Sequence, residues 1–213
     1  MTWSWQSSEI DQPESWLPVP RDLDAEDRGE WAANVILALK SEWGTEWRDE
    51  FVAPIALVLD AFSASRRAGD GPAYLCWPAP VPVCFAVTVN VFDSHLVPDW
   101  SRQGYDVRSY ETEQLGPGIQ CSAERRGCIA GQEVDLVSTV FVFDDGVSSV
   151  IIEVDEVPAM VAPFVNPDVQ RFVASVALTR PDGKAYRAEP SRQLLTEADD
   201  GWRSSYDRSR AAS

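Results

Sequence analysis

Two apolar runs around a short acidic turn dominate the hydrophobic pattern of the chain. Residues 134–157 read VDLVSTVFVFDDGVSSVIIEVDEV, with Asp144-Asp145-Gly146 between the runs. An Asp-Gly pair between apolar runs is a strong signal for a β-hairpin. The first run is apolar on both faces near the turn, as in a strand that is covered on both sides. The pattern therefore predicts a hairpin at the centre of a sheet.

The second strand of this hairpin is predicted to have one apolar face and one polar face that is exposed to solvent. Val150, Ile152 and Val154 alternate with polar positions, which places them on one face. Glu153 and Asp155 fall on the opposite face by the same alternation. We interpret the hairpin as core structure that carries no chemistry of its own. The two aspartates of the turn are explained by turn geometry, without a metal site.

Helical periodicity precedes the sheet. Apolar residues recur at four-residue spacing over 25–43, and Asp24 is placed to cap this helix. A second helix is predicted over about 46–68. Pro54 is unfavourable in a helix interior, so either the regular helix begins near Val52 or the helix bends there. Two helices with a short joint predict a helical hairpin.

The period changes to two after the helical pair. Besides the central hairpin, strands are predicted over 73–77, 83–91, 105–115 and 119–125. A final helix is predicted over 168–178, after a loop punctuated by prolines. Consecutive strands with helices at both ends predict the α+β class. We expect a mostly antiparallel meander sheet of about five to six strands, with the N-terminal helical pair and the C-terminal helix packed on it.

The chain length suits one domain, which we place at residues 1–180. Residues 1–24 are predicted to be irregular. Burying indole rings is favourable, so part of the segment with Trp3, Trp5 and Trp16 should pack against the domain, or otherwise against a partner. Residues 181–213 are polar and lack periodicity, so we interpret them as a mobile tail.

The formal net charge of −16 bears on partners. It argues against nucleic acid and against anionic membranes, both of which require a cationic surface. No apolar run approaches the ~18 residues of a membrane span, and the first residues lack the pattern of a signal peptide. We therefore expect a cytoplasmic protein. Arginine far outnumbers lysine, a bias typical of a GC-rich bacterial genome.

The cysteines do not predict a metal site. Two spacings matter here, from Cys76 to Cys84 and from Cys121 to Cys128. Both are longer than the C-x2–4-C spacing of structural zinc sites. Disulfides are disfavoured in the cytoplasm, and Cys84 lies in an apolar strand as a small hydrophobe. No nucleophile elbow, phosphate-binding loop, dinucleotide fingerprint or zinc-protease motif is present, so we predict no cofactor.

Four residues remain as binding candidates. Trp77 stands beside a proline-rich segment, and Trp100 and Tyr105 flank the end of a loop over 92–104. Amphipathic rings next to rigid segments often form recognition surfaces, although packing in the core or at the sheet edge is the more common role of a ring such as Trp77. His95, the single histidine, could act as a general base if a carboxylate oriented it.

The last third of the chain has a layout known from other proteins. The segments VSTVFVF, DDG, VSSVIIEVDEVP and NPDVQRFVASVALTR form strand, turn, strand with proline, and helix. This layout resembles the C-terminal half of Mog1/PsbP-like α+β proteins, including small actinobacterial proteins, and the opening WLPVPRDLD…WAANVILAL is similar to them as well. The resemblance implies a non-enzymatic binding or accessory role and assigns no catalytic residue.

These observations favour a non-catalytic cytoplasmic protein that binds another protein, of an acidic chaperone or adaptor type, with a basic protein as the candidate partner. One alternative is an immunity-type inhibitor of a basic toxin. Another is a small hydrolase-like enzyme that uses His95 with a carboxylate. A third is a small-ligand binder with a pocket between the sheet and the helical pair. The sequence predicts no oligomeric state.

Overall fold

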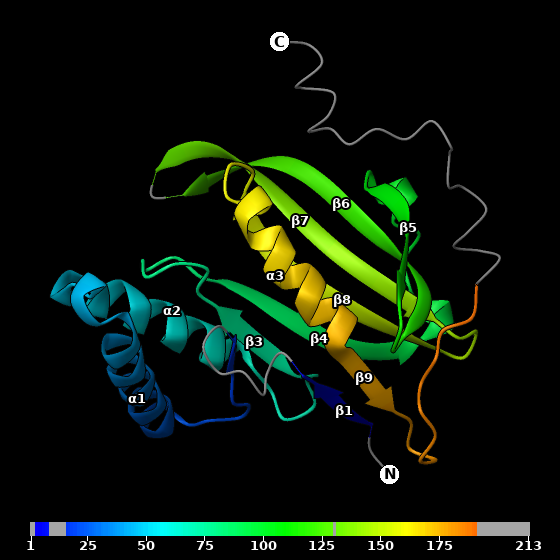
Figure 1. The fold of residues 1–213 in the computed structure, drawn as a ribbon, viewed down its shortest axis with the longest axis horizontal. Coiled ribbons are helices and arrows are strands. Elements are labelled where there is room, and N and C mark those ends of the chain that lie inside the picture. The colour runs from blue at the N-terminus through cyan, green and yellow to red at the C-terminus, as the bar shows by residue number, and fades with distance from the viewer. Residues whose placement is uncertain (1–2, 9–15, 130, 191–213) are drawn as a thin grey trace.

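The computed structural model describes residues 3–8, 16–129 and 131–190 of the 213-residue chain. Within these residues lie a seven-stranded antiparallel sheet, ordered β2-β3-β4-β8-β7-β6-β5, and a two-stranded sheet of β1 and β9 (Figure 1). The strands are β1 (Ser4–Ser7), β2 (Trp16–Pro18), β3 (Ala73–Cys76), β4 (Phe85–Asp93), β5 (Asp106–Thr112), β6 (Gly116–Ile129), β7 (Gln132–Asp144), β8 (Ser148–Pro158) and β9 (Val176–Thr179). The α-helices are α1 (Ala25–Trp43), α2 (Val52–Ser65) and α3 (Ala162–Ser175). The predicted α+β class is confirmed, and the large sheet has more strands than expected.

The predicted hairpin is β7–β8, and β8 is the middle strand of the large sheet. Its turn is held by side chains, since Asp144 accepts the Gly146 N–H at 2.6 Å and Asp145 accepts the Ser148 N–H at 2.7 Å. The turn thus accounts for both aspartates. On its other side β8 pairs with β4, so the chain makes an excursion through β5, β6 and β7 before it returns to the centre.

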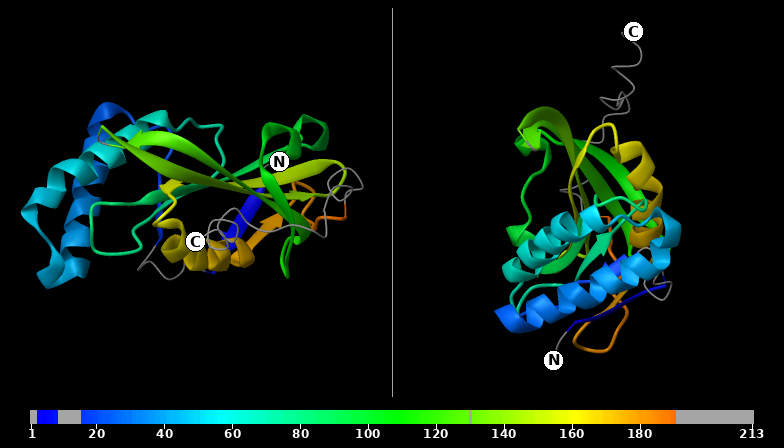
Figure 2. Two further views of the ribbon diagram at one scale, coloured as in Figure 1. Left: turned by 90° about the horizontal axis from the view of Figure 1, so that it is seen from above. Right: turned by 90° about the vertical axis from the view of Figure 1, so that its left-hand side faces the viewer.

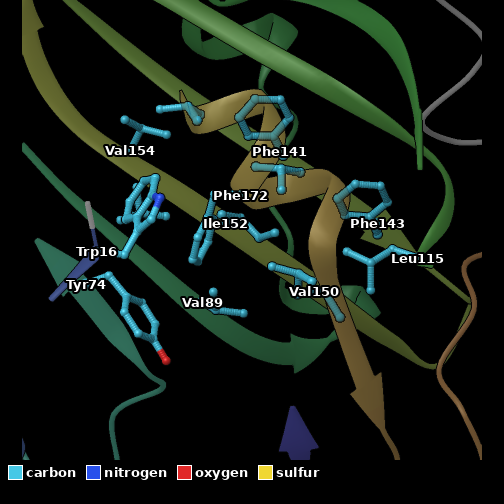
Figure 3. Close-up of a cluster of buried hydrophobic side chains, with 14 of the residues drawn as sticks. Trp16, Tyr74, Val89, Leu115, Phe141, Phe143, Val150, Ile152, Val154 and Phe172 are labelled. Carbon is cyan, nitrogen blue, oxygen red and sulfur yellow. The ribbon is translucent and has the colours of Figure 1, made fainter. Parts of the chain in front are cut away.

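One face of the large sheet packs against α3. Phe172 of α3 lies against Trp16 of β2 and Tyr74 of β3, with ring centroids 4.6 and 5.5 Å apart (Figure 3). Trp5 of β1 meets Tyr74 at 5.1 Å, and Trp3 packs on the same cluster. The expectation that the N-terminal tryptophans pack on the domain is confirmed.

The opposite face carries the helical pair at the β2–β3–β4 end of the sheet (Figure 2). Leu75 and Ala86 face α1 and α2, whereas their neighbours along the strands face α3. As predicted, Asp24 caps α1, accepting the N–H groups of the residues two and three positions on at 2.9 Å. The second helix begins at Val52, which places Pro54 in its first turn.

Strands β3 and β4 approach closely at Gly71, just before β3. A Cβ atom built at Gly71 would stand 1.8 Å from the backbone oxygen of Val89. Because that oxygen belongs to the sheet backbone, it has no room to move. The position therefore requires glycine for space rather than for an unusual φ angle.

The last helix begins earlier than predicted. It starts at Ala162 rather than Asp168, because Pro163 occupies the first turn, where a missing N–H costs no helical hydrogen bond. It also ends earlier, since residues 176–179 form β9 and pair with β1. Local periodicity cannot reveal this pairing, because β1 lies about 170 residues away in the sequence.

Both predicted terminal boundaries need correction. Tyr186 is 1% exposed and its hydroxyl donates to the Phe143 carbonyl at 2.7 Å, so the packed domain runs past residue 180 to the end of the described part at residue 190. The rest of the predicted tail, 191–213, lies outside the described residues. At the other end, the segment expected to be irregular contributes β1 and β2.

Candidate functional site

A pocket of about 480 Å³ lies between the first half of α3 and the facing side of strands β5 to β8. Its roof is formed by residues of α3, among them Ala162, Val165, Asn166 and Val169. The strands supply the floor, and the pocket lies on the face opposite the helical pair. A pocket between sheet and helical pair was expected for the small-ligand alternative, and this pocket instead lies beneath the last helix.

The register of the strands gives the floor a polar and an apolar side. One row across the sheet runs from Asp106 on β5 through Ser122 and Thr139 to Val154 on β8. The hydroxyls of Ser122 and Thr139 lie 3.5 Å apart. Polarity therefore falls steadily along this row, from a carboxylate at the sheet edge to a valine at its centre.

The neighbouring rows repeat this gradient. Arg108 on β5 is paired with Gln120 on β6, while Glu124 on β6 is paired with Val137 on β7. All four line the pocket. A ligand lying across the strands would meet charged and amide groups at one end and aliphatic groups at the other.

A β-bulge in β8 completes the apolar side. Val137 pairs with Val157 and Thr139 with Val154, so two steps along β7 match three along β8. Residues 154 and 157 would face opposite sides of a regular strand. The extra residue reverses this parity, and both valines line the pocket. Glu156, inside the bulge, is held by a two-pronged ion pair with Arg125 of β6.

Amide groups from α3 reach the polar side. Gln170 of α3 donates to the side-chain oxygens of Gln120 and Asn166, at 3.5 and 3.3 Å. These contacts are long, so they orient the amides more than they stabilise the fold. The amide assignment follows this hydrogen-bond pattern. Gln120 and Asn166 both line the pocket.

The start of α3 offers few free backbone donors to the pocket. The Phe164 and Val165 N–H groups both donate to the Val161 carbonyl, at 2.9 and 3.2 Å. The Val161 N–H donates to the Pro158 carbonyl at 2.8 Å. Pro163 has no N–H at all. The arrangement lacks the row of free N–H groups with which helix N-termini hold anions.

The predicted binding residues lie on the other face of the sheet and do not form one group. Trp100 and Tyr105 pack edge to face, 5.0 Å apart, over a cluster that includes Cys121. Trp77 packs instead with the α1–α2 cluster. All three rings are half-buried, and within the described residues the N–H groups of Trp77 and Trp100 are buried without a hydrogen-bond partner.

His95 lies in an exposed 3-10 turn of the loop that covers this opposite face. In the described part of the chain no hydrogen bond or ion pair joins it to a carboxylate. The pocket is on the far side of the sheet, so His95 cannot act there. Its use as a general base stays a prediction without a geometric partner.

The titratable groups with raised pKa values lie outside the pocket. Burial, followed by repulsion from Glu153 and Glu156, raises the pKa of Asp155 to about 6. Burial raises the pKa of Cys121 to about 12, and it does the same, as the largest cause, for Cys76 and Cys84. All four cysteines are free thiols, and only Cys128 of them is exposed. Among the described residues no cluster of side chains fits a metal ion.

Two sequence signals indicated the pocket without identifying it. Polar residues alternate along β6 at Gln120, Ser122 and Glu124, a pattern that a solvated strand face shows equally well. Along β8 the apolar alternation breaks between Val154 and Val157, which is the signature of the bulge. Neither signal indicates that a helix covers the polar face.

Comparisons with protein-family models, curated proteins and solved structures found no match to this chain. The resemblance to Mog1/PsbP-like proteins therefore stays a prediction. The structure defines the class as an α+β protein with an antiparallel sheet, covered by α3 on one face and by a helical pair on the other. Among the residues described, no helix is long and apolar enough to cross a membrane.

Proposed function

We propose that this chain is a non-catalytic binding protein and that the pocket beneath α3 is its ligand site. The pocket itself carries the proposal: about 480 Å³ of space with a polar and an apolar side. Small-molecule sites commonly have volumes of roughly 300–1,000 Å³, with mostly apolar walls and a few placed polar groups. The ligand is then a small amphipathic molecule, or an amphipathic group on a larger one.

Binding is favoured over catalysis by the groups that surround this space. The apolar side consists mainly of valines and alanines, and the bases that share the pocket with the Ser122–Thr139 hydroxyl pair are the carboxylates Asp106 and Glu124 rather than a histidine. The single histidine is on the opposite face. Histidine is the side chain that most often serves as the base for a hydroxyl nucleophile, so an arrangement with carboxylates alone suits recognition better than turnover.

Nile red, a neutral dye that brightens in apolar surroundings, tests the site. We expect the wild-type protein to enhance its fluorescence, and Ala162→Trp to abolish the effect by filling the pocket from its roof. Val137→Trp fills it from the floor and serves if the first variant unfolds. Ala38→Trp, at an exposed position of α1, is the matched control and should bind like wild type. Equal enhancement by all four proteins would refute the pocket as the site.

A protein partner is the second candidate, and two exposed apolar side chains favour it. Met160 and Phe164 are 80% and 77% exposed, and they alternate along the chain with pocket-lining residues. Large apolar side chains left in water beside a pocket are common in recognition surfaces. The strong acidity of the chain makes a basic partner the natural complement.

Affinity capture from the native host tests this candidate. We expect Phe164→Ser to lose a protein that the wild type retains at physiological salt. Leu57→Ser, which removes a 71%-exposed side chain from α2, is the control and should retain that protein. A partner captured equally by both variants would place the interface elsewhere on the molecule.

A further inference from the structure

The charges around the pocket indicate which amphipathic molecules it takes. Asp106 and Glu124 contribute two carboxylates to the lining. Among the described residues that line the pocket, Arg108 is the one cationic side chain. The lining thus carries an excess of one negative charge, within a chain of net charge −16. A ligand head group meets these charges at the β5–β6 side.

The N-terminus of α3 adds little affinity for an anionic head group. A helix N-terminus attracts anions through free N–H groups and the positive end of its dipole. At the start of α3 the Phe164 and Val165 N–H groups are already bonded to the Val161 carbonyl, and Pro163 has none. The amides of Gln120 and Asn166 are neutral and add no charge to the site, and their side-chain oxygens accept from Gln170.

Resting on the proposed function, we infer that the pocket selects amphipathic molecules with a cationic head, such as an aliphatic amine, over anionic ones such as fatty acids. The ammonium group lies at the Asp106–Glu124 side, and the aliphatic part lies against Val154 and Val157 beneath α3. A carboxylate head in the same position faces the excess negative charge and is rejected. The sign of the head group is therefore the specificity element of this site.

Three probes of equal chain length test the inference: octylamine, octanamide and octanoate. Each is titrated into the 15N-labelled full chain at pH 7, and the affinity is measured from the amide signals of pocket residues such as Ser122 and Val165. We expect octylamine to bind at least ~10-fold more tightly than octanoate, with octanamide between them, and ~1 M salt to reduce this ratio.

Variants separate the pocket charges from the net charge. Asp106→Asn with Glu124→Gln should remove the preference for octylamine or reverse it, because Arg108 then dominates. Glu111→Gln with Glu113→Gln makes the same change in net charge at exposed positions outside the pocket lining and should keep the preference. Loss of the preference in this control pair would overturn the inference in favour of a long-range charge effect.

The outcomes also distinguish the inference from the function beneath it. Equal binding of octylamine and octanoate, or tighter binding of octanoate, overturns the charge selection and leaves the pocket as the ligand site. Nile red binding that Ala162→Trp abolishes, without any shift by the three octyl probes, has the same meaning. Failure of both Nile red and the octyl probes removes the proposed function as well.

Discussion

Truncation of Tyr186 should show that the segment after residue 180 belongs to the core. The ring is 1% exposed, packs edge to face with Trp3 at 5.8 Å and lies 5.3 Å from the Arg180 guanidinium. Removing a buried aromatic side chain costs about 3–5 kcal/mol, and the ring contacts add roughly 0.5–1.5 kcal/mol. We therefore expect Tyr186→Ala to lower the free energy of unfolding by about 4–6 kcal/mol, a large share of the roughly 5–15 kcal/mol typical of a domain.

Tyr186→Phe isolates the hydroxyl. That group donates to the carbonyls of Phe143 at 2.7 Å and Ser148 at 3.1 Å, at the two ends of the hairpin turn. Losing these bonds while keeping the ring should cost about 1–2 kcal/mol. The two variants together divide the contribution of the residue into ring burial and hydrogen bonding.

Urea unfolding followed by far-ultraviolet circular dichroism measures both losses, as shifts of the midpoint at an unchanged m value. Lys184→Ala is the control, since its side chain is 80% exposed in the same segment and should change stability by less than about 0.5 kcal/mol. A loss below about 1 kcal/mol for Tyr186→Ala would refute the reasoning. It would mean that residues 181–190 behave in solution as the mobile tail that their polarity suggests.

Three further predictions concern charge, space and thiol access. Because the pKa of Asp155 is raised to about 6, the folded state binds a proton more tightly than the unfolded state, so stability should fall as pH rises from about 4 to about 6. Asp155→Asn should flatten this dependence in urea titrations, and an unchanged slope would contradict it. Neighbouring atoms crowd the carboxylate and raise its pKa, but the side chain as a whole is open to solvent, so the effect should stay below about 1 kcal/mol. Gly71→Ala should lower the free energy of unfolding by about 2–3 kcal/mol, since the added Cβ atom has no room. The control Gly29→Ala in α1, where a Cβ atom meets nothing, should raise the free energy of unfolding by about 0.5–1 kcal/mol. Equal effects of the two substitutions would argue against the close approach of Gly71 to Val89. In native protein a maleimide should label Cys128 first and Cys121 only after unfolding, and early labelling of Cys121 by mass spectrometry would exclude a buried thiol.

Strong local patterns predicted the elements whose signals lie within a few residues. The β7–β8 hairpin followed from an Asp-Gly turn between apolar runs, and the start of α1 from Asp24 before an acidic turn. The start of α2 at Val52 is one of the two alternatives that Pro54 left open, the other being a bend in the helix. In each case the physical cause is local, namely turn geometry, a capped N–H or a missing one. The order of the strands needed contacts across the whole chain.

Long-range contacts account for the terminal segments that the sequence did not place. The sequence pattern predicts most of β9 as the end of the last helix. In the structure this segment is a strand because it pairs with β1, which comes from the opposite end of the chain. Tyr186 stands in a polar segment, and only the fold reveals the core position that its ring fills. Tertiary packing overrides local polarity at such positions, because one buried aromatic ring outweighs several solvated neighbours.

The pocket depends on the same kind of hidden information. The polar alternation of β6 is also what a solvated strand shows, and the strand predicted over 105–115 is β5, an edge strand of the large sheet. These polar residues become part of a pocket because α3 covers the face that their alternation left polar. The bulge at Glu156 then turns Val157 to the same side as Val154. One inserted residue thus lets the middle strand of the sheet contribute both to the core and to the pocket lining, and the Arg125–Glu156 ion pair anchors the bulge from the polar strand β6. This ion pair links β6, the strand that carries polar residues of the pocket, to the bulge in β8 that completes the apolar side.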